Sequence, residues 1–349
     1  MQSGKRFFSR FALPIAAAGV FSVCSLQPAL AAESDQALDA AEAQALATWT
    51  SDIASIEVPG QGCFQAEYPN LYWKAVACGV GQPRAHTVPP PKGGTNVTGN
   101  GHDYAAGVSG LISKAVGTFP SVTGVTHEQS VGVAAFGDNG ILGPNEYTLQ
   151  LNTNFFNTTT AACQGHSGCL VWQQFIYSTD YLEAGEAEVF MQYWLINWGS
   201  DPCPSGFGSD DEGDCYGNSN YANVPDYKIA RLGGETLTAQ VNGSTDTVTF
   251  TVPGFSYAVS GPDSMLDIST VWNLAEFNVV GDAGGSRADF NKGSSVSVNI
   301  VVDHTGTPAK PKCERNAGTT GETNNLDLGT CTAARTGNGA GSIAFTESN

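Results

Sequence analysis

The chain has 349 residues, of which 15 are Lys or Arg and 33 are Asp or Glu, so its formal net charge at pH 7 is −18. Such an acidic surface repels phosphate backbones and excludes nucleic acid as an expected partner. Beyond the first thirty or so residues, no apolar run is long enough to span a bilayer, so we expect no membrane association of the mature protein.

Residues 1–31 are typical of a cleavable secretory signal. The segment opens with three cations, Lys5, Arg6 and Arg10. An apolar run over residues 11–24 follows, and Ala29-Leu30-Ala31 supplies a small-x-small cleavage pattern. Cleavage after Ala31 leaves 12 cations against 33 acids, a net charge of −21. We therefore expect a secreted protein, extracellular or periplasmic.

The cysteines predict a set of disulfides. The chain has nine, and loss of Cys24 with the signal leaves eight, an even number that is typical of exported proteins. Eight cysteines allow 105 pairings, so connectivity cannot be deduced strictly. They nevertheless occur as near neighbours around polar stretches. We predict four local disulfides: Cys63–Cys78, Cys163–Cys169, Cys203–Cys215 and Cys313–Cys331.

Residues 32–100 are expected to form a separate N-terminal segment. A helix over 34–56 is predicted from an apolar stripe that includes Leu46, Trp49 and Ile53. A cysteine-bounded module and a Pro- and Gly-rich linker follow it. The segment is either a structural arm of the next domain or a pro-segment that covers a groove. We therefore divide the chain into a signal at 1–31, this segment at 32–100 and a β domain at 101–349.

After residue 100 the pattern is that of β-strands. Period-two runs are separated by Gly, Asn, Asp and Pro clusters. They cover residues 147–156, 170–178, 189–198, 246–252, 272–280, 295–302 and 342–348. The sequence therefore predicts an all-β fold, a two-sheet antiparallel (concanavalin-like) β-sandwich with an N-terminal helical segment. A closed barrel is the alternative.

Familiar catalytic motifs are missing from the sequence. Ser109 and Ser167 each miss the GxSxG spacing, and His127-Glu128 does not continue into HExxH. The cysteines are expected to be paired, and the histidines are scattered. We therefore predict no metal site and no cofactor.

Polar residues within the predicted strands are the remaining candidates. Gln and Asn side chains alternate there with aromatic and aliphatic ones, as on a strand that lines a groove. Glu276 is the most distinctive, because it stands in the apolar run WNLAEFNVV. Its surroundings should raise its pKa and suit it to acid–base chemistry.

Several segments resemble a family of glutamic peptidases, the eqolisins. AEFNVVGDAGGSRADFNKGSSVSVNI (275–300) is similar to their Ala-Glu-Trp strand with its following turn and final strand. LVWQQFIYS and VFMQYWLINW resemble their pair of central strands. The chain also resembles the neprosin-like peptidases, which have an N-terminal activation segment and an aromatic strand that enters a Cys-bounded loop, as residues 190–206 do here. Together the similar segments cover about half of the chain.

The resemblance implies a Gln/Glu catalytic dyad. Glu276 would activate a water and protonate the leaving amine, and Gln173 would stabilise the oxyanion. Gln173 is chosen for its place in the strand order, although Gln150 also matches the family pattern. We further predict that Trp194, Gln174 and Asn278 bind the substrate.

The leading functional hypothesis is a secreted acid endopeptidase of the glutamic type, a monomer that acts on polypeptides. The alternative is a secreted carbohydrate-binding or carbohydrate-active β-sandwich, in which Trp172, Trp194 and Trp198 stack on sugar rings. A third hypothesis is a non-catalytic exported protein whose groove binds a peptide or a surface partner.

Overall fold

A computed structural model describes most of the chain. Its described residues are 27–81, 103–132, 143–154, 158–179, 185–210, 213–282, 286–306, 309–315, 322–336 and 340–349. Most of the predicted signal and the predicted linker lie outside these ranges. The chain divides into two compact units, Met1–Ala45 and Leu46–Asn349. Every strand and every site considered below lies in the second unit.

The predicted N-terminal helix is present as α1, Gln27–Ile53. Within the second unit its last turns bury Trp49 and Ile53 against Ala66. The Trp49 indole Nε1 donates to the Asn70 carbonyl at 2.7 Å. The helix ends at Ile53, shortly before Pro59. Within the described part of the chain, no helix combines the length and apolar character that a membrane crossing requires.

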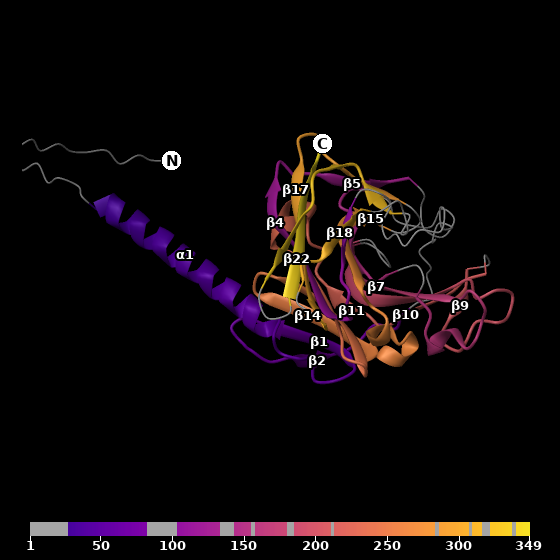
Figure 1. Ribbon diagram of the computed structural model, residues 1–349. Coiled ribbons are helices and arrows are strands. Elements are labelled where there is room, and N and C mark those ends of the chain that lie inside the picture. Colours follow the sequence, from indigo (N-terminus) through magenta and orange to yellow (C-terminus); the bar gives the residue numbers. More distant parts are fainter. Residues whose placement is uncertain are drawn as a thin grey trace, which may run out of the picture. The chain divides into compact units, whose positions relative to one another are not determined.

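The larger of two main sheets contains ten strands (Figure 1). Its strands occur in the order β2-β1-β14-β13-β12-β4-β17-β22-β20, and β21 also pairs with β22. Their bounds are β1 Gly62–Glu67, β2 Lys74–Val76, β4 Ile112–Thr123, β12 Thr236–Val241, β13 Thr245–Val252, β14 Phe255–Pro262, β17 Ser295–His304, β20 Asp327–Leu328, β21 Thr332–Arg335 and β22 Ala340–Ser348.

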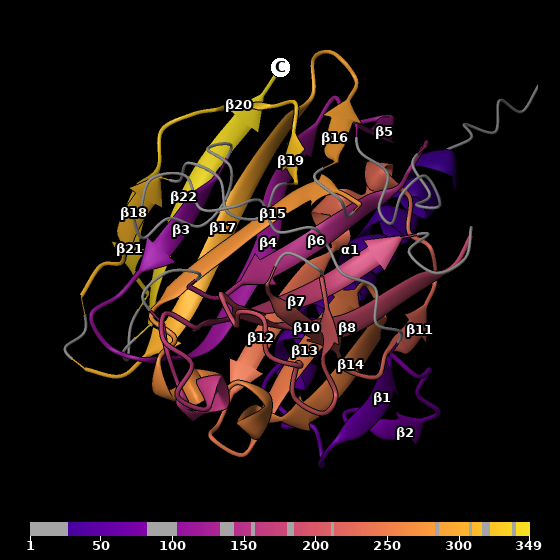
Figure 2. The ribbon, with the colours of Figure 1, turned by 90° about the vertical axis from the view of Figure 1, so that its right-hand side faces the viewer.

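The second main sheet contains nine strands and lies against the first (Figure 2). Its order is β18-β3-β15-β6-β7-β8-β10-β9, with β11 also on β8. Their bounds are β3 Tyr104–Gly107, β6 Tyr147–Asn152, β7 Leu170–Thr179, β8 Ala187–Ile196, β9 Gly208–Ser209, β10 Cys215–Asn218, β11 Ala222–Val224, β15 Leu274–Gly281 and β18 Lys312–Arg315.

Smaller elements complete the described fold. A three-stranded sheet has the order β19-β16-β5. Its strands are β5 Glu128–Val131, β16 Arg287–Phe290 and β19 Thr323–Asn324. Four short 3-10 turns connect strands: η1 Ala161–Cys163, η2 Ile229–Gly234, η3 Asp263–Met265 and η4 Ile268–Thr270.

The core lies between the two main sheets. Tyr177 of the nine-stranded sheet stacks on Phe250 of the ten-stranded sheet, with ring centroids 3.9 Å apart. The Phe277 ring lies over Gly117, where an added Cβ would come within 2.2 Å of the ring. Glycine at this position therefore lets the sheets approach closely. This packing confirms the predicted two-sheet sandwich, and the two separate sheets rule out the closed barrel.

The strand that follows α1 belongs to the sandwich. All six residues of β1 pair with β14, from Gly62↔Ser260 to Glu67↔Phe255. The compact unit begins at Leu46 and includes β1. Removal of β1 would uncover the edge of β14.

All four predicted disulfides are confirmed. The Cα–Cα distances lie between 5.4 and 6.1 Å for the pairs Cys63–Cys78, Cys163–Cys169, Cys203–Cys215 and Cys313–Cys331. Four disulfides are in keeping with a protein that folds in an oxidising compartment. The pair Cys313–Cys331 links β18 of one main sheet to the start of β21 in the other.

Candidate functional site

Polar side chains form a row across the nine-stranded sheet, on the face turned away from the core. Strand register aligns seven residues from seven neighbouring strands. In order from β18 to β10 they are Glu314, Ala105, Glu276, Asn152, Gln174, Gln192 and Asn218. Six of these seven positions carry a carboxyl or an amide group, so residues far apart in sequence meet on one surface.

Hydrogen bonds connect the row. The Asn152 Nδ2 group donates to Glu276 Oε2 at 3.2 Å, and Gln174 Nε2 donates to Gln150 Oε1 at 3.0 Å. The Trp194 indole Nε1 donates to Gln174 Oε1 at 3.2 Å and to Gln192 Oε1 at 3.0 Å. These contacts fix the amide orientations. Among the described residues, Asn152 Oδ1 has no hydrogen-bond partner, so it remains free to accept one.

Glu276 is the central acid of this row. Its side chain is only 2 % exposed. Burial raises the pKa of Glu276 well above its ordinary value, and the neighbouring Asp103 carboxyl raises it further. Two carboxyls in contact can form a hydrogen bond only when one of them is protonated. Glu276 is therefore built to hold a proton at pH values where an exposed glutamate has lost it.

The short strand β3 forms the floor of a trough beside Glu276. Its residues on the polar face are small: Ala105 lies between Glu314 and Glu276, and Gly107 lies between Lys312 and Leu274. A Cβ placed on Gly107 would lie 3.1 Å from Glu314 Cγ and 3.4 Å from Leu274 Cδ1. The absence of side-chain bulk on β3 thus separates the β18 wall from the β15 wall. We call this feature the β3 trough.

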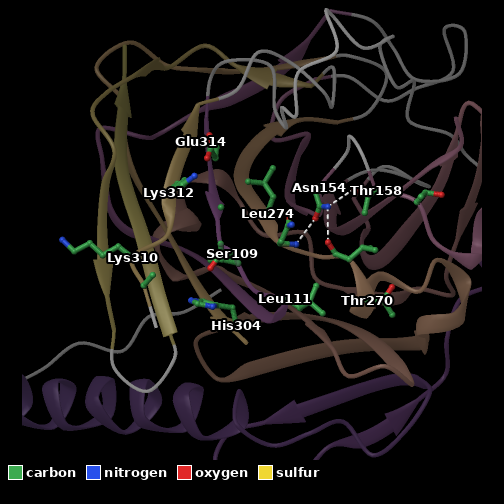
Figure 3. A pocket seen from close by; sticks show the side chains of 16 residues that line it. Ser109, Leu111, Asn154, Thr158, Thr270, Leu274, His304, Lys310, Lys312 and Glu314 are labelled. Carbon is green, nitrogen blue, oxygen red and sulfur yellow. Dashed lines mark hydrogen bonds between the residues drawn. The ribbon is translucent and has the colours of Figure 1, made fainter. Parts of the chain in front are cut away.

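The β3 trough opens into a pocket of about 710 Å³. Figure 3 shows Lys312, Ser109 and His304 along one side, and Asn154 and Thr158 on the other. Asn154 is held in place because its Nδ2 donates to Thr158 Oγ1 at 2.8 Å and its Oδ1 accepts from the Asn273 N–H at 3.0 Å. The pocket therefore presents hydroxyl, amide and charged groups with fixed orientations.

Glu276 does not itself line this pocket. Leu274, two residues earlier on the same face of β15, does line it, and so does Asn154, two residues after Asn152. A two-residue step along a strand is about 6.6 Å. Glu276 therefore lies one two-residue strand repeat beyond the pocket, where burial keeps its pKa high.

The structure does not bring together the predicted dyad. Gln173 follows the opposite parity from Gln174 and points into the core, where its Nε2 lies 3.6 Å from Met191 Sδ. Glu276 points to the other face of the same sheet. The odd positions of β7 face the opposing sheet, so Gln173 is separated from Glu276 by the sheet itself.

The predicted substrate-binding residues share the face of Glu276. Gln174 lies two strands away, with Asn152 between, and it makes no direct contact with Glu276. The Asn278 Nδ2 group donates to Glu347 Oε2 at 3.4 Å. Trp194 is fully buried and its indole Nε1 is bound to the row, so it supports the amides and presents no ring face to a ligand.

The other two tryptophans considered for sugar stacking are also covered. Trp172 is 1 % exposed. Trp198 stacks on the His166 ring, with centroids 3.7 Å apart. Stacking of sugars on these rings is therefore not available in this structure.

Several residues of the site were not identified from the sequence, among them Asp103, Asn152, Lys312 and Glu314. Asp103 stands beside the linker, and β18 is a four-residue strand, too short to give a periodic signal. The signal in the sequence that could have identified Lys312 and Glu314 is Cys313, because a disulfide fixes the position of the neighbouring side chains on its strand. The pairing of β18 with β3 depends on contacts that local sequence does not encode.

No cation site emerges from the described residues. In the ranges that the structure covers, no three His, Cys, Asp or Glu side chains are grouped as metal ligands. In the acidic loop near Cys215, Asp214 Oδ1 accepts the Asn197 N–H at 2.7 Å and Asp210 Oδ1 accepts the Asp214 N–H at 2.9 Å. These carboxylates brace the loop backbone.

Comparisons with known proteins give a weak likeness in fold to solved structures. No family model and no curated protein matches the chain. Among solved structures, it is similar to the kappa-carrageenase from Pseudoalteromonas carrageenovora in complex with an oligotetrasaccharide of kappa-carrageenan. The identity is 7%, the match covers 84% of this chain and 97% of that one, and the TM-score is 0.25. At these values the likeness carries no argument about substrate or mechanism.

The glutamic peptidase prediction is wrong. Its catalytic pair requires Gln173 and Glu276 on one surface, and they lie on opposite faces of the sheet. No family model matches the chain, so none supports a glutamic peptidase. The carbohydrate-active β-sandwich and the non-catalytic binding protein are the two hypotheses left.

Proposed function

We propose that the protein is a secreted carbohydrate-active β-sandwich that binds a glycan in the β3 trough and hydrolyses a glycosidic bond there. The observation that carries this proposal is the placement of two carboxyl groups, Glu276 and Glu314, in one cross-strand row with only Ala105 between them. Glycoside hydrolysis generally requires such a pair, one protonated and one ionised.

The lining of the pocket supports a polyhydroxylated ligand. Asn154, Thr158, Thr270 and Ser109 offer amide and hydroxyl groups that both donate and accept hydrogen bonds. Asn154 is preorganised by its own hydrogen bonds, so little conformational entropy is lost when it contacts a sugar hydroxyl. Leu111 and Leu274 add apolar surface for the C–H faces of the sugar rings.

The two carboxyls have environments that suit different roles. Burial and Asp103 keep Glu276 protonated, so it can donate a proton to the leaving glycosidic oxygen. Glu314 is exposed and can take a proton from water as that water attacks the anomeric carbon and the C–O bond breaks. The pair spans the intervening strand β3. We propose that a water fits between the two carboxyl groups and that the anomeric configuration inverts.

Secretion is part of the same proposal. The n-region, the apolar run and the cut after Ala31 indicate export, and the four disulfides accord with it. A secreted protein that degrades polysaccharides would meet its polymeric substrate outside the cell.

The test is to incubate the purified mature chain with a panel of soluble polysaccharides. Hydrolysis is measured by the release of reducing ends. Glu276→Gln and Glu314→Gln should each lower kcat by more than about 100-fold, while KM changes little. NMR of the first product should show the anomer opposite to that of the substrate.

Glu67→Gln is the matched control, because Glu67 is an exposed glutamate on β1 of the other sheet and should leave the rate unchanged. Wild-type rates in both site variants would overturn the catalytic assignment. Failure of the mature chain to bind or cleave any polysaccharide would overturn the function itself.

A further inference from the structure

The pocket has the opposite charge balance from the chain as a whole. The protein carries 33 acids against 15 Lys and Arg residues. The pocket lining contains two lysines, Lys310 and Lys312, against one acid, Glu314, with His304 on the same wall. A local excess of positive charge within a strongly negative molecule indicates a place where an anion is bound.

Lys312 is the best placed of these cations. Register pairs it with Gly107 of β3, which in turn pairs with Leu274 of β15. Because Gly107 has no side chain, nothing from β3 separates the Lys312 ammonium group from the trough. Figure 3 shows Lys312 on the pocket wall next to Glu314, whereas the Lys310 side chain extends away from the centre of the pocket.

Within the part of the chain that the structure describes, neither lysine is neutralised by a neighbour. The ion pairs found among the described residues are His166–Asp201, Lys228–Asp226 and Arg287–Asp289, and none of them involves the pocket. Lys312 is exposed on an edge strand that the Cys313–Cys331 disulfide anchors. Its charge is therefore available to a ligand at a fixed place on the wall.

We infer that the glycan bound in the β3 trough is anionic, and that Lys312 binds a sulfate ester or carboxylate on the sugar unit that occupies the pocket. This inference rests on the proposed carbohydrate function and specifies its substrate class. His304 lies on the same wall, and its Nδ1 is 2.9 Å from the Thr305 carbonyl oxygen, so this nitrogen carries a proton in the neutral ring.

The experiment compares binding of matched oligosaccharides to the mature chain with Glu276→Gln, which prevents turnover. Each pair has the same length and linkage and differs in one group: sulfated against unsulfated, and uronate against its neutral sugar. We expect at least one anionic member to bind about 10-fold tighter at low salt, with the preference falling as NaCl screens the charge. The sulfated and uronate pairs reveal which anion is preferred.

Variants then assign the preference to Lys312. In the same background, Lys312→Met should reduce the preference about fivefold or more, and Lys312→Arg should retain it. Lys310→Met should have a smaller effect. Lys292→Met, at an exposed lysine in the turn before β17, is the matched control and should have none.

The outcomes distinguish failure of the anionic-ligand inference from failure of the proposed carbohydrate function. Equal binding of charged and neutral members, or an unchanged preference in Lys312→Met, overturns the anionic-ligand inference and leaves the carbohydrate function standing. Absence of binding to every oligosaccharide and polysaccharide overturns the carbohydrate function, and the inference falls with it.

Discussion

At the scale of single residues, the site depends on how Glu276 keeps its proton. The largest cause of its raised pKa is burial, and the second is the adjacent carboxyl of Asp103. The Asn152 amide acts in the opposite direction, because its donated hydrogen bond favours the charged form. The balance favours the neutral acid, which is the form that can protonate a leaving group.

Asp103→Asn should therefore shift the pH–activity profile. Removal of the neighbouring negative charge lowers the pKa of Glu276, so the acid loses its proton at lower pH. The alkaline limb of kcat/KM should move to lower pH. The measurement is a pH series of initial rates, with Glu67→Gln as control. An alkaline limb that stays in place would show that Asp103 does not tune this acid.

Gly107→Val should close the β3 trough. Gly107 is not among the residues with positive φ, so a side chain is tolerated by the backbone there. The new methyl groups would occupy the space between Lys312 and Leu274 and push Glu314 aside. We expect at least about a 10-fold rise in the Kd for oligosaccharide, with a Tm shift of only a few degrees.

The control for this variant is Gly233→Ala. At that position an added Cβ would meet only Val122 and a backbone oxygen, at 3.5 Å or more, on another part of the surface. The ligand affinity of Gly233→Ala should equal that of the wild type. Unchanged affinity in Gly107→Val would place the ligand elsewhere.

At the scale of elements, one disulfide supports the wall of the site. Cys313 lies between Lys312 and Glu314 on β18, an edge strand of four residues that pairs on one side only, with β3. Cys331 anchors it to the opposite sheet. Because so short an edge strand frays readily, the covalent link holds both site side chains in register.

Replacement of Cys313 and Cys331 by Ser should weaken binding and stability together. A crosslink over 18 residues restricts the unfolded chain by about 3 kcal/mol in the chain-entropy description. The matched variant replaces Cys203 and Cys215, which close a loop of 12 residues at the far side of the same sheet. It should lose stability and keep ligand affinity. Equal affinity losses in both would argue against a special role for β18.

The strands themselves were largely predictable from sequence, and their pairing was not. The run predicted over 170–178 is β7, Leu170–Thr179, because alternating polarity in an aromatic segment is a local signal. In contrast, the choice between Gln173 and Gln174 required knowledge of which face turns toward Phe250 and its sheet. Alternation along a strand separates its residues into two faces but does not tell which face packs against the other sheet. The predicted pair, Gln173 and Glu276, therefore lies on opposite faces of the sheet.

The face with the polar residues also differs from its expected state. A solvated outer face is the ordinary interpretation of Gln and Asn in strands. Here Gln150, Asn152, Gln174 and Gln192 are each no more than 2 % exposed. Hydrogen bonds within the row compensate for this burial, and such reciprocal contacts between distant segments leave no trace in the local sequence.

At the scale of the whole molecule, buried carboxyls should make the protein an acid-stable one. Burial raises the pKa of Glu128 to about 9, and the pKa values of Glu235 and Asp246 to about 8. In the unfolded chain these groups titrate near pH 4. Between those limits the folded state holds more protons than the unfolded state, so rising pH favours unfolding.

We therefore expect Tm to be highest at or below about pH 5 and to fall by about 5 °C or more by pH 8. Glu235→Gln should flatten part of this slope, because the amide that replaces the carboxyl can still accept the Tyr147 hydroxyl and does not titrate. Thermal unfolding across a pH series in wild type and variant is the measurement. A Tm that rose from pH 5 to pH 8 would contradict the expectation.

The outer strands of both main sheets have a consequence for behaviour at high concentration. The sheets end in β2 and β20, and in β18 and β9, which are two to four residues long. Strands of other molecules can pair with an exposed sheet edge, and fibrils can start there. Short or charged edge strands disfavour such pairing. Lys74, Asp327 and Lys312 place charge on three of the four borders. Such a molecule should resist aggregation at high protein concentration, even when acid has reduced its net charge.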